Sequence, residues 1–323
     1  MLNITDKNQK DKEIRIAVVI PAFNEEKLIG RVLGTLPKFI DQVIVVDDCS
    51  RDKTAEIVKE FQKTDPRIIL IRHQKNQGVG SAISSGYQEA LKQNVDIAVV
   101  VAGDAQMDPE DMMNLIKPVA SGKADYCKGN RLFRGESWKM IPRYRYFGNA
   151  FLSLLTKFAS GYWHVADSQC GYTAISATAL RALDLKSIYK KYGVPNDLLI
   201  KLNIHNFRVN DVPVRPIYGE EKSGIRLWKI VPRISWLLIK GFSERLWQKY
   251  VIKDFHPLVF FYAFAFLLLA LSLPFLVRLL YIWIFSDYVP NITALALIFV
   301  TITGFQFLFF AMWFDMENNK SLK

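Results

Sequence analysis

The stretch from Ile97 to Pro109 holds the side chains with the clearest chemical potential in this chain. An apolar run typical of a buried strand, Ile97–Val101, gives way to Asp104 and Gln106. Ligands of open α/β sheets bind beyond the carboxyl ends of strands, and a carboxylate there can hold a divalent cation against a diphosphate. We therefore predict that Asp104 takes part in ligand or metal binding. The alternative is that it only caps a helix, since a helix start follows at Asp108.

Polar residues also follow the first two predicted strands. The loop PAFNEE begins at Pro21, and the adjacent carboxylates Asp47 and Asp48 follow the second strand. Two neighbouring carboxylates repel each other, which is unfavourable unless donors or a cation bind them. Carboxylates at such positions commonly accept hydrogen bonds from ribose hydroxyls. Helix capping is the alternative for Asn24 and for the Asp pair.

A glycine-containing turn, Gly78-Val79-Gly80, precedes a predicted helix and lets the backbone come close to a ligand. The spacing is not GxGxxG, so a dinucleotide-binding fold is poorly supported.

A cationic stretch, 129–146, follows later and suits phosphate groups, because arginine binds them with two parallel hydrogen bonds. A solvated loop is the alternative for this stretch. Its cations are Arg131, Arg134, Lys139, Arg143 and Arg145.

These residues need a sheet to position them. Over roughly the first 220 residues, short apolar strands alternate with charged helical stretches, which predicts an α/β domain with one nucleotide-sized crevice. We expect strands at 15–20, 42–46, 68–71, 97–101 and 125–128, and an edge strand at 208–216. We expect helices at 28–36, 54–60, 81–93, 109–120, 147–162 and 198–203.

Two uncharged runs near the carboxyl terminus, 258–277 and 292–314, are each long enough to cross a bilayer. Buried core helices are the alternative. Lys and Arg crowd the sequence before the first run and Lys320 and Lys323 follow the second, whereas the linker 281–291 contains neither. The positive-inside rule therefore predicts two spans with both chain ends and the α/β domain in the cytoplasm.

The net charge of +11 admits nucleic acid, a membrane surface or an acidic small molecule as partner. Between residues 225 and 256, seven Lys or Arg stand against two acidic residues, with tryptophans interleaved. This pattern indicates amphipathic helices on anionic lipid, and a solvated helix face is the alternative. Pro232 and Gly241 predict two short helices rather than one. Because this segment adjoins a predicted span, we expect no nucleic-acid partner.

The remaining composition excludes several classes of site. The three cysteines are widely spaced without a CxxC, which supports neither a disulfide framework nor a zinc site. The four histidines form no HExxH, and no GxSxG is present, so hydrolase triads and histidine-rich metal sites find no support. Residues 1–13 are polar and predict a flexible tail rather than a cleavable signal peptide.

Five motifs in order, PAFNEE, VDDCSRDKT, NQGVGSAISSGYQEA, GDAQMDPED and DSQCGYTAIS, resemble the family 2 glycosyltransferases of the GT-A fold. With the carboxyl-terminal hairpin, the chain resembles the polyprenyl-phosphate glycosyltransferases, the dolichol-phosphate mannose synthase group, over about residues 15–316. The resemblance implies a Rossmann-like GT-A catalytic domain at 14–223, amphipathic interface helices at 224–256, a transmembrane hairpin at 257–316 with spans of about 258–280 and 292–314, and a cytoplasmic tail at 317–323.

The resemblance also implies site roles. Asp104 and Gln106 would contact a Mg²⁺ or Mn²⁺ ion that bridges the donor diphosphate, and Ala102 stands where relatives often carry a further Asp. Arg131 matches the family's arginine after the fifth strand, and Asp167 and Gln169 match the turn that faces the donor sugar and the acceptor. Together with Asp104, these three would be the catalytic residues. The nucleotide-binding set is Pro21, Ala22, Asn24, Glu25, Asp47, Asp48, Gly78 and Lys222. The set for the acceptor phosphate is Arg131, Arg134, Arg143 and Arg145.

The implied activity is a one-step, metal-dependent inverting transfer of a sugar to polyprenyl or dolichyl phosphate at the membrane, with UDP-glucose preferred over GDP-mannose as donor. The acceptor phosphate is ionised at neutral pH, so the reaction needs no strong general base. It needs cations around two anions and a diphosphate leaving group. Two alternatives remain open: transfer to another lipid or glycan acceptor, and a catalytically inactive nucleotide-sugar-binding scaffold. Self-association into a homo-oligomer is also left open.

Overall fold

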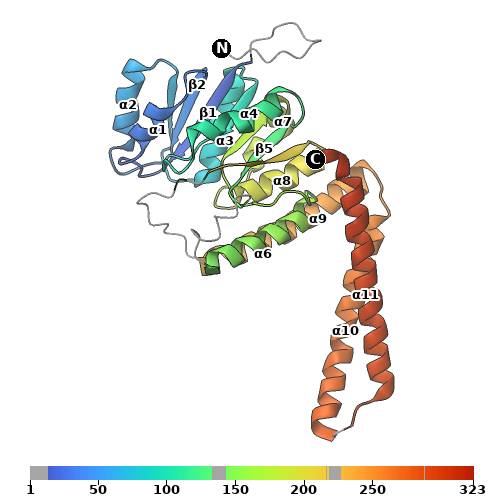
Figure 1. Cartoon of the computed structure of the whole chain (residues 1–323). Coiled ribbons are helices and arrows are strands. Elements are labelled where there is room, and N and C mark those ends of the chain that lie inside the picture. The colour runs from blue at the N-terminus through green and yellow to red at the C-terminus, as the bar shows by residue number, and fades with distance from the viewer. Residues whose placement is uncertain (1–13, 133–142, 216, 218–226, 287) are drawn as a thin grey trace. The chain divides into compact units, whose positions relative to one another are not determined.

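The computed structural model describes residues 14–132, 143–215, 217, 227–286 and 288–323 (Figure 1). The chain divides into two compact units, and each is described by itself. The first contains residues 1–242 with 322–323, and the second contains residues 243–321. The first unit is an α/β domain and the second is a helical hairpin.

The described part of the first unit contains a seven-stranded sheet in the order β3-β2-β1-β4-β6-β5-β7. β1, β2, β3 and β4 run parallel, and β6 is antiparallel to both β4 and β5. The strands are β1 (Ile16–Ala22), β2 (Gln42–Asp47), β3 (Ile68–Arg72), β4 (Ile97–Val100), β5 (Tyr126–Asn130), β6 (Thr173–Ser176) and β7 (Val209–Pro213).

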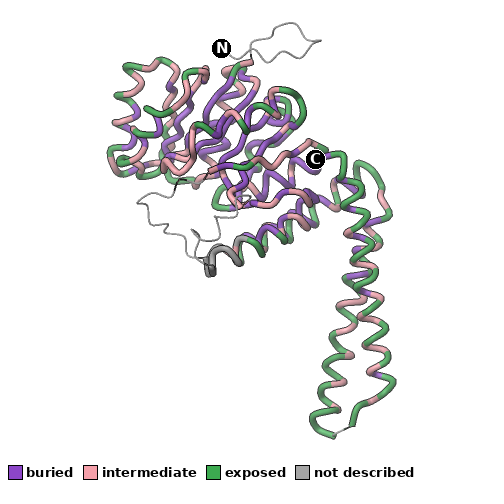
Figure 2. Tube along the Cα trace, in the orientation of Figure 1, coloured by how far each residue is buried: buried purple, intermediate pink, exposed green. Residues whose placement is uncertain are grey.

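The central strands are apolar throughout because both faces of the sheet are covered. In β1, Ile16, Val18 and Ile20 enter one core, and Ala17 and Val19 enter the other. Figure 2 shows these strands as buried. The first core is closed by α1 (Ile29–Thr35), α2 (Thr54–Thr64) and α4 (Met112–Ala120), and the second by α3 (Val79–Lys92), α7 (Ala177–Ala182) and α8 (Val194–Ile204).

The first five predicted strands are present with bounds within two residues of those expected. The edge strand predicted at 208–216 is the shorter β7 (Val209–Pro213), which lies at the end of the sheet beside β5. β6 was not predicted, because its four residues follow a polar turn and carry no long apolar run. Its insertion between β4 and β5 brings that polar turn to the edge of the sheet where β4 and β5 end.

Helix α9 (Leu227–Trp247) is continuous, so the prediction of two short helices from Pro232 and Gly241 is wrong. Pro232 lies in the second turn, where few intrahelical hydrogen bonds precede it. Gly241 is a packing position: a Cβ there would overlap the side chain of Ile200 on α8. Glycine at this position therefore lets two helices approach closely and does not end a helix.

The hairpin unit consists of a π-helical turn (Gln248–Lys253), α10 (Leu258–Ser286) and α11 (Asn291–Asn318). α10 and α11 lie side by side, with Gly304 of α11 against Leu269 of α10 (Figure 1). Both are long and apolar enough to span a membrane, and most of their residues are exposed rather than buried (Figure 2). This exposure disfavours the alternative of core helices.

Candidate active site

A pocket of about 560 Å³ lies at the carboxyl ends of β1, β2 and β4. This volume is within the range of small-molecule sites. Parallel strands bring their carboxyl ends to the same edge of the sheet, which explains how loops distant in sequence meet here. Six of the residues predicted to bind the nucleotide or the metal line the pocket, namely Pro21, Ala22, Glu25, Asp48, Gly78 and Asp104.

The loops after β1 and β2 are joined by hydrogen bonds. Asn24 has a left-handed backbone (φ 57°), its N–H donates to Ser50 Oγ at 2.9 Å, and its Oδ1 accepts from the Arg51 N–H at 2.9 Å. The Glu25 N–H donates to Thr54 Oγ1 at 2.8 Å. Since α1 begins at Ile29, Asn24 is no helix cap. Its side chain instead holds one wall of the pocket against the neighbouring loop.

The two adjacent aspartates are satisfied by different partners. Asp47 is fully buried, its Oδ1 accepts from the Ser50 N–H at 3.0 Å, and its Oδ2 lies 3.1 Å from Arg72 Nε, an ion pair without hydrogen-bond alignment. Asp48 accepts from the N–H groups of Gln77 (2.9 Å) and Gly78 (2.7 Å) and lies 2.7 Å from His73 Nδ1. Asp48 thereby fixes the glycine turn in the pocket wall.

The glycines of that turn accommodate protein backbone. A Cβ on Gly78 would overlap the Lys190 carbonyl oxygen, and a Cβ on Gly80 would overlap that of Tyr189. The Gly80 N–H donates to the Lys190 carbonyl at 3.0 Å. The close approach that the sequence indicated is therefore made by the segment 189–193, and three of its residues, Tyr189, Lys191 and Tyr192, line the pocket. Gly78 itself still lines the pocket.

Asp104 sits in a tight turn after β4. Its Oδ1 accepts from the Gln106 N–H at 3.1 Å, and the intervening Ala105 has a left-handed backbone (φ 55°). Burial raises the pKa of Asp104, although the Gln106 N–H and the charge of Arg131 oppose this. At Ala102, the backbone N–H donates to Met107 Sδ at 3.2 Å, so this position is tied to the loop behind it.

These donors fit one kind of metal site. Among the described residues, no group of three or more His, Cys, Asp or Glu is arranged to hold an ion. Mg²⁺ commonly takes one or two carboxylates together with substrate phosphates and water, rather than an all-protein cage. A half-buried Asp104, whose negative charge burial disfavours, is suited to such a cation. Gln106 follows in the same turn as a neutral oxygen donor.

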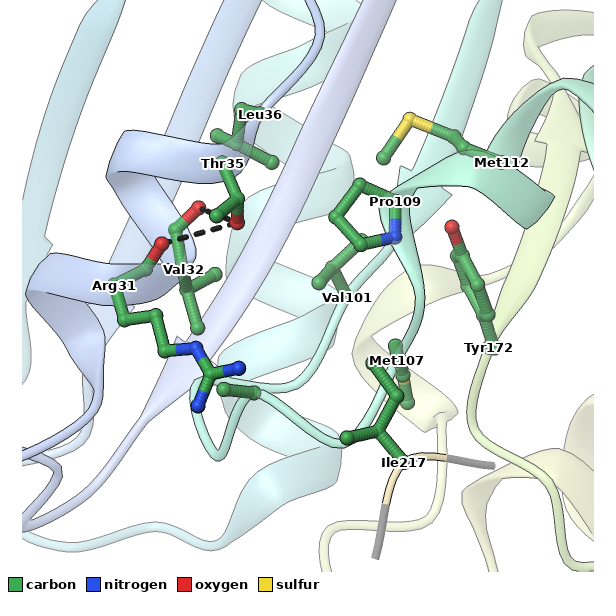
Figure 3. A pocket seen from close by; sticks show the side chains of 11 residues that line it. Arg31, Val32, Thr35, Leu36, Val101, Met107, Pro109, Met112, Tyr172 and Ile217 are labelled. Atoms are coloured by element: carbon green, nitrogen blue, oxygen red, sulfur yellow. Dashed lines mark hydrogen bonds between the residues drawn. The ribbon is translucent and has the colours of Figure 1, made fainter. Parts of the chain in front are cut away.

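A second, much smaller cavity of about 60 Å³ lies behind this loop (Figure 3). Arg31 from α1 and Met107, Tyr172 and Ile217 are among the side chains that surround it. It is too small for a nucleotide, and its lining is mostly apolar. Ile217 also donates its N–H to the Gln106 carbonyl at 3.1 Å, which supports the turn from Asp104 to Gln106 from this side.

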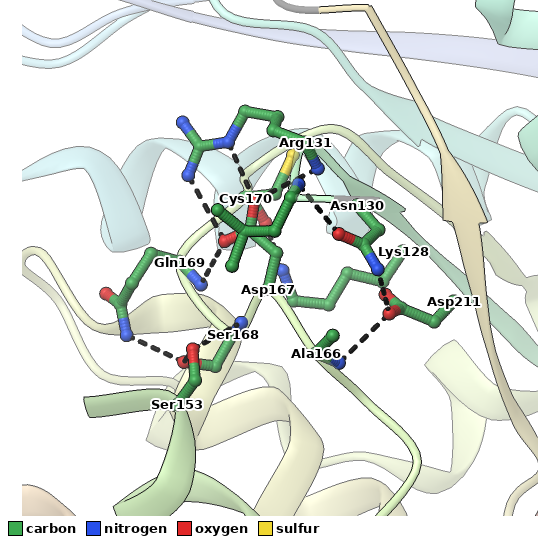
Figure 4. Close-up of polar contacts among 11 residues, drawn as sticks. Lys128, Asn130, Arg131, Ser153, Ala166, Asp167, Ser168, Gln169, Cys170 and Asp211 are labelled. Carbon is green, nitrogen blue, oxygen red and sulfur yellow. Dashed lines mark hydrogen bonds and ion pairs between the residues drawn. The ribbon is translucent and has the colours of Figure 1, made fainter. Parts of the chain in front are cut away.

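Arg131 and Asp167 form a two-pronged ion pair (Figure 4). Arg131 Nε lies 2.8 Å from Oδ2 and Nη2 lies 3.2 Å from Oδ1, while the Arg131 backbone N–H donates to Oδ2 at 3.2 Å. Burial alone would raise the pKa of Asp167, but Arg131 and then Lys128 hold it below its usual value. Gln169 donates its N–H to Asp167 Oδ1 at 3.1 Å, so the structure brings these three predicted residues together.

Two charged residues that the sequence analysis missed support this turn, the buried Lys128 and the half-buried Asp211. Lys128 is fully buried, and its Nζ donates to the Cys170 carbonyl at 2.6 Å. Asp211 Oδ2 accepts from the Ala166 N–H at 3.0 Å and from Asn130 Nδ2 at 2.7 Å (Figure 4). The sequence feature that could have indicated Lys128 is a lysine within a predicted buried strand. Such a charged group is rarely buried without a specific partner.

Several predicted residues cannot be placed. Arg134 and Lys222 lie outside the described residues. Arg143 and Arg145 begin helix α6 (Arg143–Ser160), but their side chains are not described. Conversely, the pocket wall includes residues that were not predicted, among them Phe23, Asn76, Gln77, Tyr189, Lys191, Tyr192 and Arg233.

Helices α6 and α9 present apolar side chains to the outside of the domain. Phe151 on α6 and Trp236 and Ile239 on α9 are exposed. The two helices meet at Phe158 and Phe242, whose ring centroids are 5.1 Å apart. Phe242 of α9 thus packs within the domain, whereas Trp236 and Ile239 of the same helix stay exposed.

Comparisons with known proteins agree with this geometry. The sequence profile described as Glycosyl transferase family 2 matches residues 17–184, about half of the chain. The chain belongs to glycosyltransferase family 2. This glycosyltransferase is 34% identical over 218 residues to UDP-N-acetylglucosamine–dolichyl-phosphate N-acetylglucosaminyltransferase of Methanococcus voltae, covering 64% of this chain and 86% of the relative. It is 28% identical to undecaprenyl-phosphate mannosyltransferase of Micrococcus luteus, covering 62% and 83%.

The same fold occurs in glucosyl-3-phosphoglycerate synthase of Mycobacterium tuberculosis, solved with Mn²⁺, UDP and glucosyl-3-phosphoglycerate. The TM-score is 0.52 at 19% identity, over 72% of this chain and 80% of that chain. At this identity the likeness concerns the fold alone. The predicted family and the predicted GT-A fold of this glycosyltransferase are confirmed.

Proposed function

We propose that this glycosyltransferase moves a sugar from a nucleoside-diphosphate sugar to polyprenyl or dolichyl phosphate. The observation that carries the proposal is the pocket at the carboxyl edge of the sheet, which is lined by the half-buried carboxylate of Asp104 together with Glu25 and Asp48. Arg131 and Asp167 are paired with each other and are not among the residues that line this pocket. Arg131 is close enough to lower the pKa of Asp104 by its charge. The relatives named for transfer to dolichyl or undecaprenyl phosphate support this choice of acceptor.

The donor is expected to enter the 560 Å³ pocket with its nucleoside between the loops that Asn24 and Asp48 hold in place. Asp104 and Gln106 would hold Mg²⁺ or Mn²⁺, which supplies positive charge to the diphosphate leaving group. UDP-glucose remains our preferred donor over GDP-mannose. The Methanococcus voltae relative, whose name specifies UDP-N-acetylglucosamine, adds that sugar to the donors to be tested.

In the proposed reaction, an oxygen of the acceptor phosphate attacks C1 of the donor sugar. The new C1–O bond forms as the bond from C1 to the diphosphate oxygen breaks, and nucleoside diphosphate leaves with the electron pair. No proton has to be removed from an ionised phosphate. The task of Arg131 is to hold two anions near each other, and Asp167 positions its guanidinium for that task.

Membrane attachment would deliver the acceptor. In this proposal the catalytic domain spans residues 14–223, the exposed apolar sides of α6 and α9 lie on lipid, and α10 and α11 cross the bilayer. The Lys and Arg residues that flank the hairpin support an orientation in which the α/β domain and both chain ends lie in the cytoplasm. Anionic lipid would attract the same cations.

The test is a transfer assay with purified protein in detergent, radiolabelled nucleotide sugars and polyprenyl phosphate. Asp104→Asn keeps the shape of the side chain and removes its charge, so we expect at least a 100-fold loss of kcat/KM at saturating Mg²⁺. Asp108→Asn is the matched control, because Asp108 lies in the same loop and its Oδ1 accepts from the Glu110 N–H at 2.9 Å. The control should keep most of the activity.

Three outcomes would argue against the proposal. Wild-type protein that binds nucleotide sugar without transferring it to any lipid phosphate would favour the inactive scaffold. Transfer to a different lipid or to a glycan would leave the donor site intact and replace the acceptor. Full activity of the Asp104→Asn variant would remove Asp104 from the proposed metal site.

A further inference from the structure

Two cations in the pocket wall have no role in the function proposed so far. Lys191 follows the segment that packs on the glycine turn, and Arg233 comes from helix α9. Both line the same pocket as Asp104. Neither has an acidic partner among the side chains that the structure describes. They are therefore available to an anionic ligand.

The backbone that carries Lys191 is held in place on both sides. The Tyr189 N–H donates to Asp197 Oδ2 at 2.9 Å, and Lys201 Nζ reaches the same oxygen at 2.7 Å. On the other side, the Gly80 N–H holds the Lys190 carbonyl. Lys191 Cγ lies 3.6 Å from the position that a Cβ on Gly78 would occupy, so the stem of Lys191 passes over the glycine turn.

Arg233 is directed to the same place by the packing of α9. Leu237 of α9 lies 3.1 Å from the position of a Cβ on Gly193, at the end of the same segment. Residues four apart share one face of a helix, so Arg233 and Leu237 lie on the side of α9 that meets this segment. The contact between Gly241 and Ile200 keeps α9 close to the domain two turns from Arg233.

The charges of the pocket explain why these cations matter. Glu25, Asp48 and Asp104 put three carboxylates around the space that a diphosphate would enter. In a half-buried pocket, phosphate groups and carboxylates repel each other unless cations lie between them. Lysine binds phosphate as a point charge, and arginine can bind it with two hydrogen bonds.

We propose that Lys191 and Arg233 form a phosphate-binding subsite in the wall of the donor pocket. The inference rests on the proposed function, and it adds two cationic side chains to a pocket that Asp104 and Gly78 also line. The ligand is a phosphate group in either case. It belongs to the diphosphate of the nucleotide sugar or to the phosphate of the lipid acceptor, and the two sources are separated by experiment.

The experiment uses the full chain in detergent with two charge-removing variants, Lys191→Gln and Arg233→Gln. Each has a matched control: Lys190→Gln changes the neighbouring lysine, and Lys240→Gln changes an exposed cation two turns further along α9. Calorimetry measures the Kd of UDP and GDP with Mg²⁺, and of uridine and guanosine without phosphate. Transfer kinetics give the KM for donor and for polyprenyl phosphate.

For the donor diphosphate, each variant is expected to weaken binding of the nucleoside diphosphate about 10- to 150-fold, the range of one charge-assisted hydrogen bond, and to leave nucleoside binding unchanged. If the subsite instead binds the phosphate of the lipid acceptor, the KM for polyprenyl phosphate should rise by the same factor, while binding of the nucleoside diphosphate stays unchanged. The controls should match wild type in both measurements. Both arms support the subsite and differ in its ligand.

The subsite is overturned if the wild-type protein binds UDP or GDP and both variants match it in every constant. It is also overturned if the controls lose as much affinity as the variants, because a general surface charge would then be responsible. If the wild-type protein binds no nucleoside diphosphate, the proposed function fails, and the subsite fails with it. Since Lys191 and Arg233 are exposed, unchanged thermal unfolding is expected for all four variants.

Discussion

Asp167→Asn tests the proposed positioning of Arg131 most directly. Asp167 accepts three hydrogen bonds from Arg131, two of them from the guanidinium. Asparagine keeps the size of the side chain and one oxygen that can accept from the Gln169 N–H. It removes the negative charge and one of the two acceptors. The turn should therefore persist while Arg131 loses its fixed orientation.

The magnitude follows from the two guanidinium hydrogen bonds. A hydrogen bond to a charged group contributes about 1.5–3 kcal/mol, against about 1 kcal/mol for a neutral one. Asparagine leaves one acceptor for the charged guanidinium, so the variant loses one charged hydrogen bond and the ion pairing, which adds up to about 1 kcal/mol, for a total cost of about 2–4 kcal/mol. Asp167 is buried and the side chain of Arg131 is 31% exposed, so screening reduces this only modestly. If the whole loss is expressed in the transition state, kcat/KM falls about 30- to 1000-fold.

The chain offers a matched control. Arg208 makes the same set of contacts with Asp125, through its backbone N–H (2.8 Å), its Nε (3.1 Å) and its Nη2 (3.2 Å). This pair lies at the start of β5 and β7, at the end of the strands opposite the pocket. Asp125→Asn removes an equivalent but more exposed pair, and it should cost at most about 1 kcal/mol of stability and leave kcat/KM unchanged.

The assay is transfer to polyprenyl phosphate for both variants, together with thermal unfolding as a function of pH. Because the pKa of Asp167 is lowered in the folded protein, its contribution to stability is present above its unfolded pKa and is lost as pH falls through the folded value. Wild type and Asp167→Asn should therefore converge in stability at acidic pH. A kcat/KM within twofold of wild type, or an equal loss in Asp125→Asn, would refute this reasoning.

Two further predictions concern packing and pH. Gly80→Ala should weaken nucleotide binding at least tenfold, because the new Cβ would overlap the Tyr189 carbonyl oxygen and displace the pocket wall. The control, Gly34→Ala on α1, adds a Cβ that meets no neighbour and should leave stability unchanged or raised. Calorimetry would measure nucleotide binding and thermal unfolding would measure stability, and equal effects of the two variants would contradict this prediction. Burial, and next the charge of Arg245, lower the pKa of Lys249 to about 7. The unfolded chain therefore binds more protons than the folded one between pH 7 and about 10, and the hairpin unit should gain stability as pH rises through this range. If unfolding of Lys249→Met in detergent depends on pH as strongly as that of wild type, this reasoning is contradicted.

The hairpin unit contains one interaction whose removal would be costly regardless of pH. Arg245 and Asp315 are both fully buried and form a two-pronged ion pair at 2.7 and 3.0 Å. Tyr250 and Asn319 donate to the same carboxylate, at 2.8 and 3.0 Å. A buried charge left without its partner costs about 3–5 kcal/mol, so this cluster fixes the base of the hairpin.

The amino-acid sequence alone determined the elements that depend on local patterning. Strands buried on both faces are recognisable as apolar runs, and α10 and α11 as long uncharged segments, because burial and membrane insertion act on each residue according to its side chain. The position of Asp104 at a strand end followed from the same pattern. The order of motifs was also sufficient to indicate the family that the comparisons established.

Tertiary structure decided which elements meet. β6 is too short to be recognised from its own sequence, yet its antiparallel place between β4 and β5 brings Asp167 to Arg131, 36 positions earlier. The glycines at 78 and 80 indicated a close backbone approach, but their partner lies about 110 residues away at Tyr189 and Lys190. The local pattern of apolar residues indicates that one surface of an element is buried. It does not indicate which other element covers that surface, because this depends on the path of the whole chain.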